Sequence, residues 1–103
     1  MEFIETNVFS RMIGRFLSEE EFRQLQLALI IQPGIGQIIP GSGGLRKLRW
    51  FSQGKGKRGG LRVIYYWYNL DNQICLLYAY KKSHQKDLTN DQIKTLKKLL
   101  EED

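Results

Sequence analysis

Acidic residues are missing from nearly half of the 103-residue chain, because residues 22–70 contain no Asp or Glu. The chain also has a single cysteine, Cys75, and a single histidine, His84. One cysteine excludes an internal disulfide scaffold, and the sequence lacks the ligands of a structural zinc site. No apolar run approaches the about 20 residues that cross a membrane, and the N-terminus is acidic where a signal peptide is basic. We therefore expect a cytoplasmic protein with no metal, no cofactor and no membrane partner.

The length and composition predict one folded domain over residues 1–103. Hydrophobic residues make up 42% of the chain and aromatic residues 12%, which is enough apolar material for a single packed core. The sequence shows no repeat and no low-complexity tract that would divide it. A disordered chain is therefore excluded.

The positive charge is concentrated in the middle of the sequence. Residues 22–70 carry eight Lys and Arg, whereas the net charge of the whole chain is +5. A globular surface usually mixes charges of both signs, so this segment predicts a polyanionic partner. Nucleic acid is the leading candidate, because Lys and Arg contacts to phosphate dominate its affinity. The alternative is a basic surface that binds nothing or faces an acidic protein.

The first half of the chain has helical periodicity. Residues 2–5 predict a short strand, and Asn7 predicts the cap of a helix with apolar residues along one face. Ser18 and Glu21 have the spacing of a capping box, which opens a second helix that ends before Pro33. The Gly-rich segment 34–44 predicts a loop.

The second half has the pattern of strands. Residues 45–51, 61–69 and 74–82 are rich in aromatic and aliphatic residues, and the polar residues 69–72 predict a tight hairpin. A capping box at 89–92 opens a C-terminal helix. The sequence therefore predicts an α+β domain: a short N-terminal strand, a two-helix hairpin, a three-stranded antiparallel sheet and a C-terminal helix, with the helices on one side of the sheet.

Strand alternation separates cations from apolar residues. Lys47 and Arg49 alternate with Leu48 and Trp50, so the two pairs face opposite sides of the sheet. Arg62 is the second residue of the next predicted strand, which is apolar on both faces after that point. We expect that strand to lie in the centre of the sheet with both faces covered.

The segment Gly54-Lys55-Gly56-Lys57-Arg58-Gly59-Gly60 alternates glycine with cations. Glycine permits close backbone approach and free amides bind anions, so this loop predicts a phosphate contact. It is not a Walker loop, because no Lys-Ser/Thr pair and no helix follow the glycines. The alternative is a soluble hairpin loop with no ligand.

The residue types limit the available chemistry. Metal-dependent nucleases need clustered carboxylates, which the basic segment lacks, so we expect a carboxylate-free cationic site. Cations suit RNA cleavage, because RNA supplies its own nucleophile, the 2′-hydroxyl. His84 has the best intrinsic pKa for proton transfer, although a lone surface histidine is an equal alternative. Tyr66 can stack on a base or belong to the core, and Cys75 is expected to pack inside a strand.

Three segments together resemble the RelE/ParE toxin superfamily, most closely its HigB branch. They are Gly43–Trp50, Gly54–Tyr66 and Leu77–Lys82 followed by Asp87–Thr89. The resemblance implies a RelE-like fold and a toxin of a type II toxin–antitoxin system. It also implies that the protein enters the A site of the 70S ribosome and cuts mRNA by 2′-hydroxyl attack, without metal. The implied partner is a helix-turn-helix antitoxin, through which alone the toxin would reach operator DNA.

The resemblance also implies catalytic roles, position by position. Arg62 matches the arginine that clamps the scissile phosphate, and Lys47 and Arg49 match a basic pair that stabilises the transition state. Lys82 matches a cation that supports the same charge. The position where many members carry a Tyr or His falls on Leu88, which leaves His84 as the nearest substitute and the general base unassigned. Further RNA contacts are expected from six residues: Arg46, Lys55, Lys57, Arg58, Lys81 and Tyr66.

Two other functions stay open. A sister branch of the same fold poisons DNA gyrase and cuts nothing, although its members tend to lack a dense cationic site. A non-catalytic module that binds RNA or the ribosome would need only the basic loop and the aromatic residues.

Overall fold

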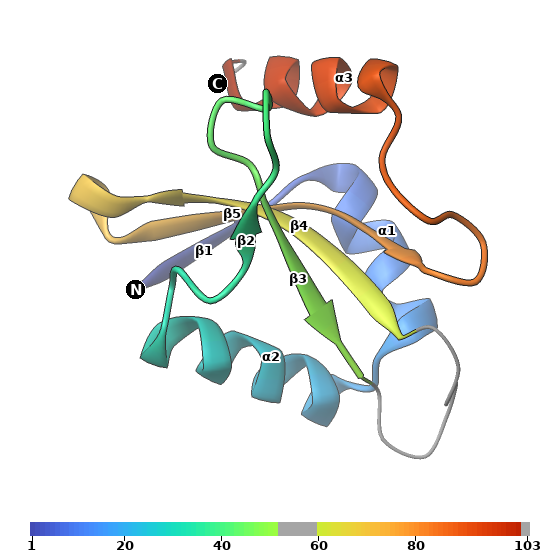
Figure 1. The fold of residues 1–103 in the computed structure, drawn as a ribbon. Coiled ribbons are helices and arrows are strands. Elements are labelled where there is room, and N and C mark those ends of the chain that lie inside the picture. The colour runs from blue at the N-terminus through green and yellow to red at the C-terminus, as the bar shows by residue number, and fades with distance from the viewer. Residues whose placement is uncertain (52–59, 102–103) are drawn as a thin grey trace.

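A five-stranded mixed sheet organises the protein in the computed structural model, which describes residues 1–51 and 60–101 (Figure 1). The strand order is β1-β5-β4-β3-β2. In chain order the elements are β1 (Glu2–Glu5), α1 (Asn7–Phe16), α2 (Glu19–Ile31), β2 (Gln37–Ile38), β3 (Arg46–Trp50), β4 (Leu61–Tyr68), β5 (Gln73–Lys81) and α3 (Asn90–Glu101). The α+β class and the predicted order of helices and long strands are confirmed.

The sheet is wider than the predicted three strands. β1, expected as a short strand, pairs in parallel with β5 along the outer edge. β2 forms inside the segment predicted as a loop, and its two residues pair with Lys47 and Arg46 of β3. A two-residue strand is too short to show alternation, so the prediction of a loop throughout 34–44 was wrong at Gln37 and Ile38.

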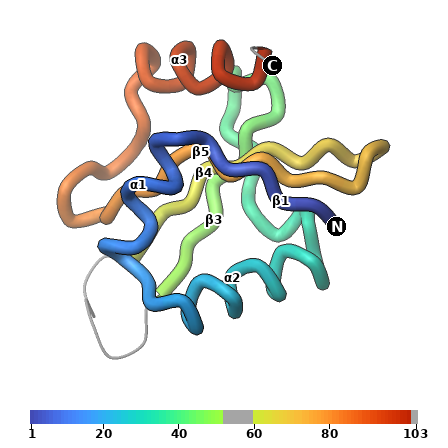
Figure 2. The backbone as a smooth tube through the Cα atoms, turned by 180° about the vertical axis from the view of Figure 1, so that it is seen from behind, coloured from blue at the N-terminus to red at the C-terminus, as the bar shows by residue number. Residues whose placement is uncertain are grey.

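The helices cover both faces of the sheet, so the prediction that they share one side was wrong. In Figures 1 and 2, α2 and α3 lie on opposite sides of the strands. α1 and α2 pack Phe9, Leu25 and neighbouring apolar residues against one face, whereas α3 packs Leu96 against the other. β4 and β5 are apolar on both faces. Both faces must be covered by helices if this apolar surface is to be buried away from water.

Side-chain caps fix where the helices begin. The α1 cap is Thr6 rather than the predicted Asn7: the Thr6 hydroxyl oxygen accepts the N–H of Phe9 at 3.0 Å and donates to the carbonyl of Leu77 at 2.8 Å. The second bond ties the helix start to β5, a long-range contact that local spacing does not reveal. The capping boxes that begin at Ser18 and Thr89 are confirmed.

The predicted hairpin between β4 and β5 is also confirmed. A short 3₁₀ turn, Asn69–Asp71, leads into Asn72, whose φ of 54° lies in the left-handed region that Asn tolerates. Further along the pair, the register shifts at Ile64 and Tyr65. This irregularity changes which β5 residues lie opposite the two halves of β4.

Tyr65 connects the central strand to the end of α2. Its side chain is fully buried, and its hydroxyl accepts the N–H of Gly36 at 2.9 Å and donates to the carbonyl of Pro33 at 2.7 Å. Burial raises the pKa of Tyr65, so the donor form persists at neutral pH. The two bonds hold the segment between α2 and β2 against the sheet.

Replacing Tyr65 with Phe removes only the hydroxyl and leaves the Gly36 N–H and the Pro33 carbonyl without their partner. We expect Tyr65→Phe to lower the free energy of unfolding by about 1–3 kcal/mol, the usual cost of a buried group left unsatisfied. Urea denaturation followed by circular dichroism measures this change. An unchanged denaturation midpoint would contradict the structural role of the hydroxyl.

Candidate nucleic-acid interface

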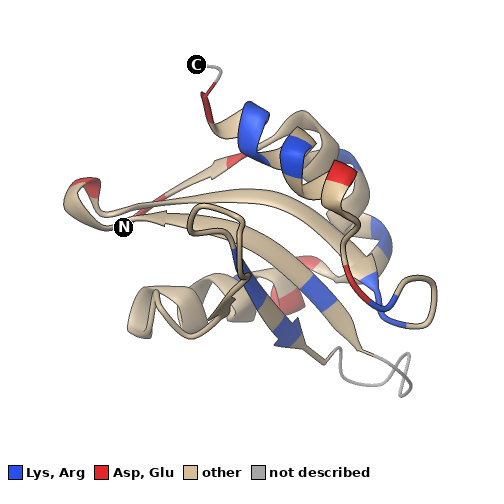
Figure 3. Cartoon of the chain, turned by 45° about the horizontal axis from the view of Figure 1, so that its top comes forward, with Lys and Arg blue, Asp and Glu red and all other residues tan. Residues whose placement is uncertain are grey.

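Three cations share the face of the sheet that α3 covers in part. In β3, Leu48 and Trp50 pack toward α1 and α2, so Lys47 and Arg49 between them face the other way. Arg49 lies directly opposite Arg62 of β4 in the antiparallel pair. Directly paired residues point to the same face, and Figure 3 shows Lys and Arg on both neighbouring strands. The alternation predicted from the sequence is confirmed.

The Arg49–Arg62 pair places two like charges side by side. Arg62 is only 5% exposed, whereas Arg49 is exposed at the open side of the strand. Like charges directly opposite each other destabilise a sheet, by an amount comparable to the about 0.2–1 kcal/mol of a favourable pair. An anion bound between the two guanidinium groups would relieve that repulsion. Arginine suits this task, because its planar fork matches the oxygens of a phosphate.

Tyr80 of β5 lies directly opposite Arg62. It therefore continues onto β5 the cross-strand row that Arg49 and Arg62 begin. Its side chain is 4% exposed, and its hydroxyl is buried with no hydrogen-bond partner in the part of the chain that the structure describes. Burial raises the pKa of Tyr80, the carboxylate of Asp87 raises it further, and Arg62 acts against both. The sequence interpretation missed this residue, because alternation indicates a strand face but not which residues meet across strands.

A carboxylate also reaches this face, so the expectation of a carboxylate-free site was wrong. The Nζ of Lys47 donates to Asp87 at 3.0 Å across 40 positions of sequence. The Asp87 side chain is 63% exposed and that of Lys47 is 22% exposed. The hydrogen bond and the charge of Lys47 lower the pKa of Asp87. Counting charges along the chain could not reveal a contact made by the returning segment between β5 and α3.

Lys82 and His84 lie in the turn that follows β5. The backbone N–H of Lys82 donates to the carbonyl of Gly60 at 3.2 Å. The backbone of Lys82 is therefore close to the paired residues Arg62 and Tyr80. Its side chain is exposed, as is that of His84, whose backbone N–H donates to Lys81. Lys82 therefore lies at the margin of the cationic row, which consists of Lys47, Arg49 and Arg62. The proton-transfer role of His84 stays a prediction.

Two of the expected RNA-binding cations lie on the opposite face. The guanidinium of Arg46 donates to the carbonyls of Gly34 and Gly36 at 3.2 and 2.8 Å. The Nζ of Lys81 sits 5.9 Å from the ring centroid of Phe16 in α1. The structure does not bring either cation together with Arg62.

Tyr66 shares the face of Arg62 but not its position. It lies four residues further along β4, about 13 Å away at the usual rise of a strand. Its ring makes an edge contact with Tyr68, with centroids 4.8 Å apart. The remaining expected contacts, from Lys55, Lys57 and Arg58, lie outside the described residues.

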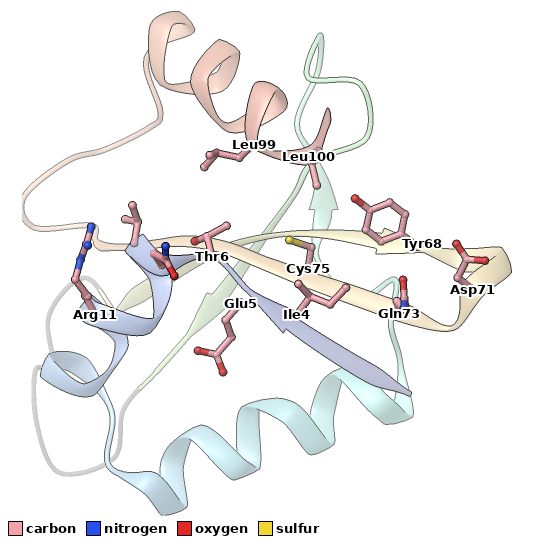
Figure 4. Close-up of a pocket in the computed structure, with 12 residues that line it drawn as sticks. Ile4, Glu5, Thr6, Arg11, Tyr68, Asp71, Gln73, Cys75, Leu99 and Leu100 are labelled. Carbon is pink, nitrogen blue, oxygen red and sulfur yellow. The ribbon is translucent and has the colours of Figure 1, made fainter. Parts of the chain in front are cut away.

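Two cavities differ in their relation to the cations. One of about 260 Å³ is lined by Lys47 and Asp87 together with residues of β2 and α3. A larger one of about 720 Å³ lies between β1, the start of α1 and the end of α3 (Figure 4). Cys75 lines the larger cavity, and burial raises the pKa of its thiol, so it is a packed strand residue as predicted. Only the smaller cavity adjoins the cationic row.

Comparison with protein families gives a match over most of the chain. A family model described as the RelE toxin of the RelE/RelB toxin–antitoxin system matches residues 8–102. Within residues 1–51 and 60–101, no helix has the length and apolar character that crossing a membrane requires. In the same ranges, no three His, Cys, Asp or Glu side chains gather closely enough to hold a metal ion.

The ion pair predicts how Asp87 titrates. Lys47 lowers its pKa below the ordinary 3.8, so the pair stabilises the folded protein above that value and the contribution is lost as pH falls through the lowered pKa. We expect Lys47→Met to raise the pKa of Asp87 toward 3.8, as measured by carboxyl-carbon NMR during acid titration. Lys94→Met, which removes an exposed cation of α3, serves as the control. Equal midpoints in the two variants would contradict the ion pair.

Proposed function

We propose, on the premise that the chain belongs to the RelE toxin family, that this toxin is a ribosome-dependent endoribonuclease that cuts mRNA in the A site without metal. The observation that carries the proposal is the row of Lys47, Arg49 and Arg62 on one face of the sheet, with the two arginines directly opposite each other. A phosphodiester is the ligand whose charge and geometry suit that row.

The proposed reaction transfers a phosphoryl group within the RNA. The ribose 2′-oxygen forms a bond to phosphorus, loses its proton to a base, and the bond to the leaving 5′-oxygen breaks as that oxygen gains a proton. The products are a 2′,3′-cyclic phosphate and a free 5′-hydroxyl. Arg62 binds the phosphate, and Arg49, Lys47 and Lys82 stabilise the additional negative charge of the transition state. The base is not assigned, and His84 is its candidate.

The family implies a cognate antitoxin as the partner of this toxin. We propose that the antitoxin is a small helix-turn-helix protein, that it alone connects the toxin to operator DNA, and that the complex is cytoplasmic. Within the family we propose the HigB branch, which the cationic Gly-rich run at 54–60 supports.

Mapping of mRNA 5′ ends after induced expression distinguishes the candidate functions. Endoribonuclease activity gives growth arrest with new ends inside translated codons. Toxicity without such cuts favours a gyrase poison, and an absence of toxicity favours a module that only binds RNA or the ribosome. The opposed arginines favour the first, because a site that concentrates charge near one phosphate stabilises a transition state.

The proposal predicts that mRNA cleavage depends on the planar guanidinium of Arg62 and not only on its positive charge. Arg62→Lys keeps one positive charge but loses paired hydrogen bonding, so we expect mRNA cleavage on ribosomes to fall by about 100-fold or more. The exposed Arg23, which pairs only weakly with Glu20 at 3.7 Å, supplies the control variant Arg23→Gln. Circular dichroism and thermal unfolding verify that both variants fold. Wild-type cleavage by a folded Arg62→Lys protein would reject the assigned role.

The proposal also predicts a strong dependence on the ribosome. The proposed site has cations but no assigned strong base, so its catalysis depends on correct orientation of the 2′-hydroxyl. The ribosome supplies that orientation by holding the mRNA. We expect the purified protein to cut free RNA at least about 100-fold more slowly than ribosome-bound mRNA under single-turnover conditions. Equal rates on the two substrates would contradict ribosome dependence.

A further inference from the structure

The hydroxyl of Tyr80 is an exception among the buried polar groups of the sheet. It is buried and has no hydrogen-bond partner among the described residues. By contrast, the hydroxyl of Tyr65 both accepts and donates a hydrogen bond within the protein. An unpartnered buried donor destabilises the fold, and a Phe at position 80 would fill the same space without that cost. The hydroxyl therefore calls for a partner that residues 1–51 and 60–101 do not supply.

The position of Tyr80 indicates what that partner is. Tyr80 lies directly opposite Arg62 on the neighbouring strand, and Arg62 lies directly opposite Arg49. The phenol is thus the third member of a row whose other two members are guanidinium groups on the same face. Its ring is held in place within the buried core cluster that also contains Leu96 of α3. A rigid donor beside two arginines suits an anion with several acceptor oxygens.

We propose that the Tyr80 hydroxyl donates a hydrogen bond to a nonbridging oxygen of the phosphate that Arg62 binds. This inference rests on the proposed function for the identity of the anion as an RNA phosphodiester. The phenol adds a directional donor without adding charge, so it fixes the orientation of the phosphate that the arginines attract. Tyr80 is then a substrate-binding residue that the family match does not assign.

The Lys47–Asp87 ion pair is the contact that a phosphate approaching this face would compete with. The Asp87 carboxylate acts electrostatically on Tyr80 and is bonded to Lys47 at 3.0 Å. The Asp87 side chain is mostly exposed, and exposed ion pairs hold their partners weakly. A phosphate that displaces Asp87 gains Lys47 as a further cation. On this proposal the substrate phosphate takes the place of Asp87 beside Lys47.

Substitution of Tyr80 by Phe separates a binding role from a packing role. Removing an unpartnered hydroxyl does not lower stability, so we expect the urea midpoint of Tyr80→Phe to be equal to or higher than that of the wild type. Affinity for a fluorescent single-stranded DNA oligonucleotide should fall about tenfold, the loss expected for one hydrogen bond to a charged group. DNA lacks the 2′-hydroxyl nucleophile, so anisotropy reports binding without cleavage. Single-turnover cleavage of ribosome-bound mRNA should fall by at least the same factor.

Tyr78→Phe is the matched control, because Tyr78 lies on the same strand and the same face but opposite Ile64 instead of Arg62. We expect it to bind the oligonucleotide and cut mRNA as the wild type does. If Tyr80→Phe also behaves as the wild type in both assays, the inference fails while the proposed function stands. A fall in both stability and cleavage assigns the hydroxyl a structural role and likewise overturns it.

The wild-type protein tests the two proposals separately. If the wild type binds the oligonucleotide but cuts nothing on the ribosome, and Tyr80→Phe weakens binding, the phosphate contact stands and the proposed nuclease function fails. If the wild type neither binds nor cuts, both are overturned.

Discussion

The register between β3 and β4 is the constraint on which the candidate site depends. It sets Arg49 opposite Arg62 and sends Lys47 to the same face. The register is held by the other side of β3, where Leu48 and Trp50 pack against α1 and α2. A slip of one residue would bury the cations beneath the helices and expose the apolar pair. Burial of apolar area on one face therefore maintains the cationic row on the other.

The same face of the sheet serves two purposes along its length. Around Ile64 and Leu77 it is part of a core that α3 covers through Leu96, whereas two residues earlier in β4 it carries the buried Arg62. The packed part explains how a guanidinium and a phenol are held rigidly at the end of the sheet. Under the proposed function rigidity has value there, because electrostatic stabilisation of a transition state works best with groups that need not move.

Local pattern predicted most of the elements and part of the site. Capping boxes, strand alternation and the turn at 69–72 depend on residues that are close in sequence, and each of these predictions was confirmed. Alternation also gave the common face of Lys47 and Arg49, and it could have excluded Arg46, which has the parity of Leu48. Pairing across strands could not be predicted in this way. Tyr80 and Asp87 reach the site only through contacts between distant segments, which no short window contains.

The free protein carries two local costs at the same place. Arg49 and Arg62 repel each other, and the Tyr80 hydroxyl lacks a hydrogen-bond partner among the described residues. In the proposed complex one phosphate placed over Arg49 and Arg62 would relieve both, and it would compete with the exposed Asp87 carboxylate for Lys47. Such costs persist in a fold only where something else over-determines the structure, here the register fixed by the helical side of the sheet. In the proposed complex, a phosphate would gain binding free energy from a site whose donors the fold already holds in position.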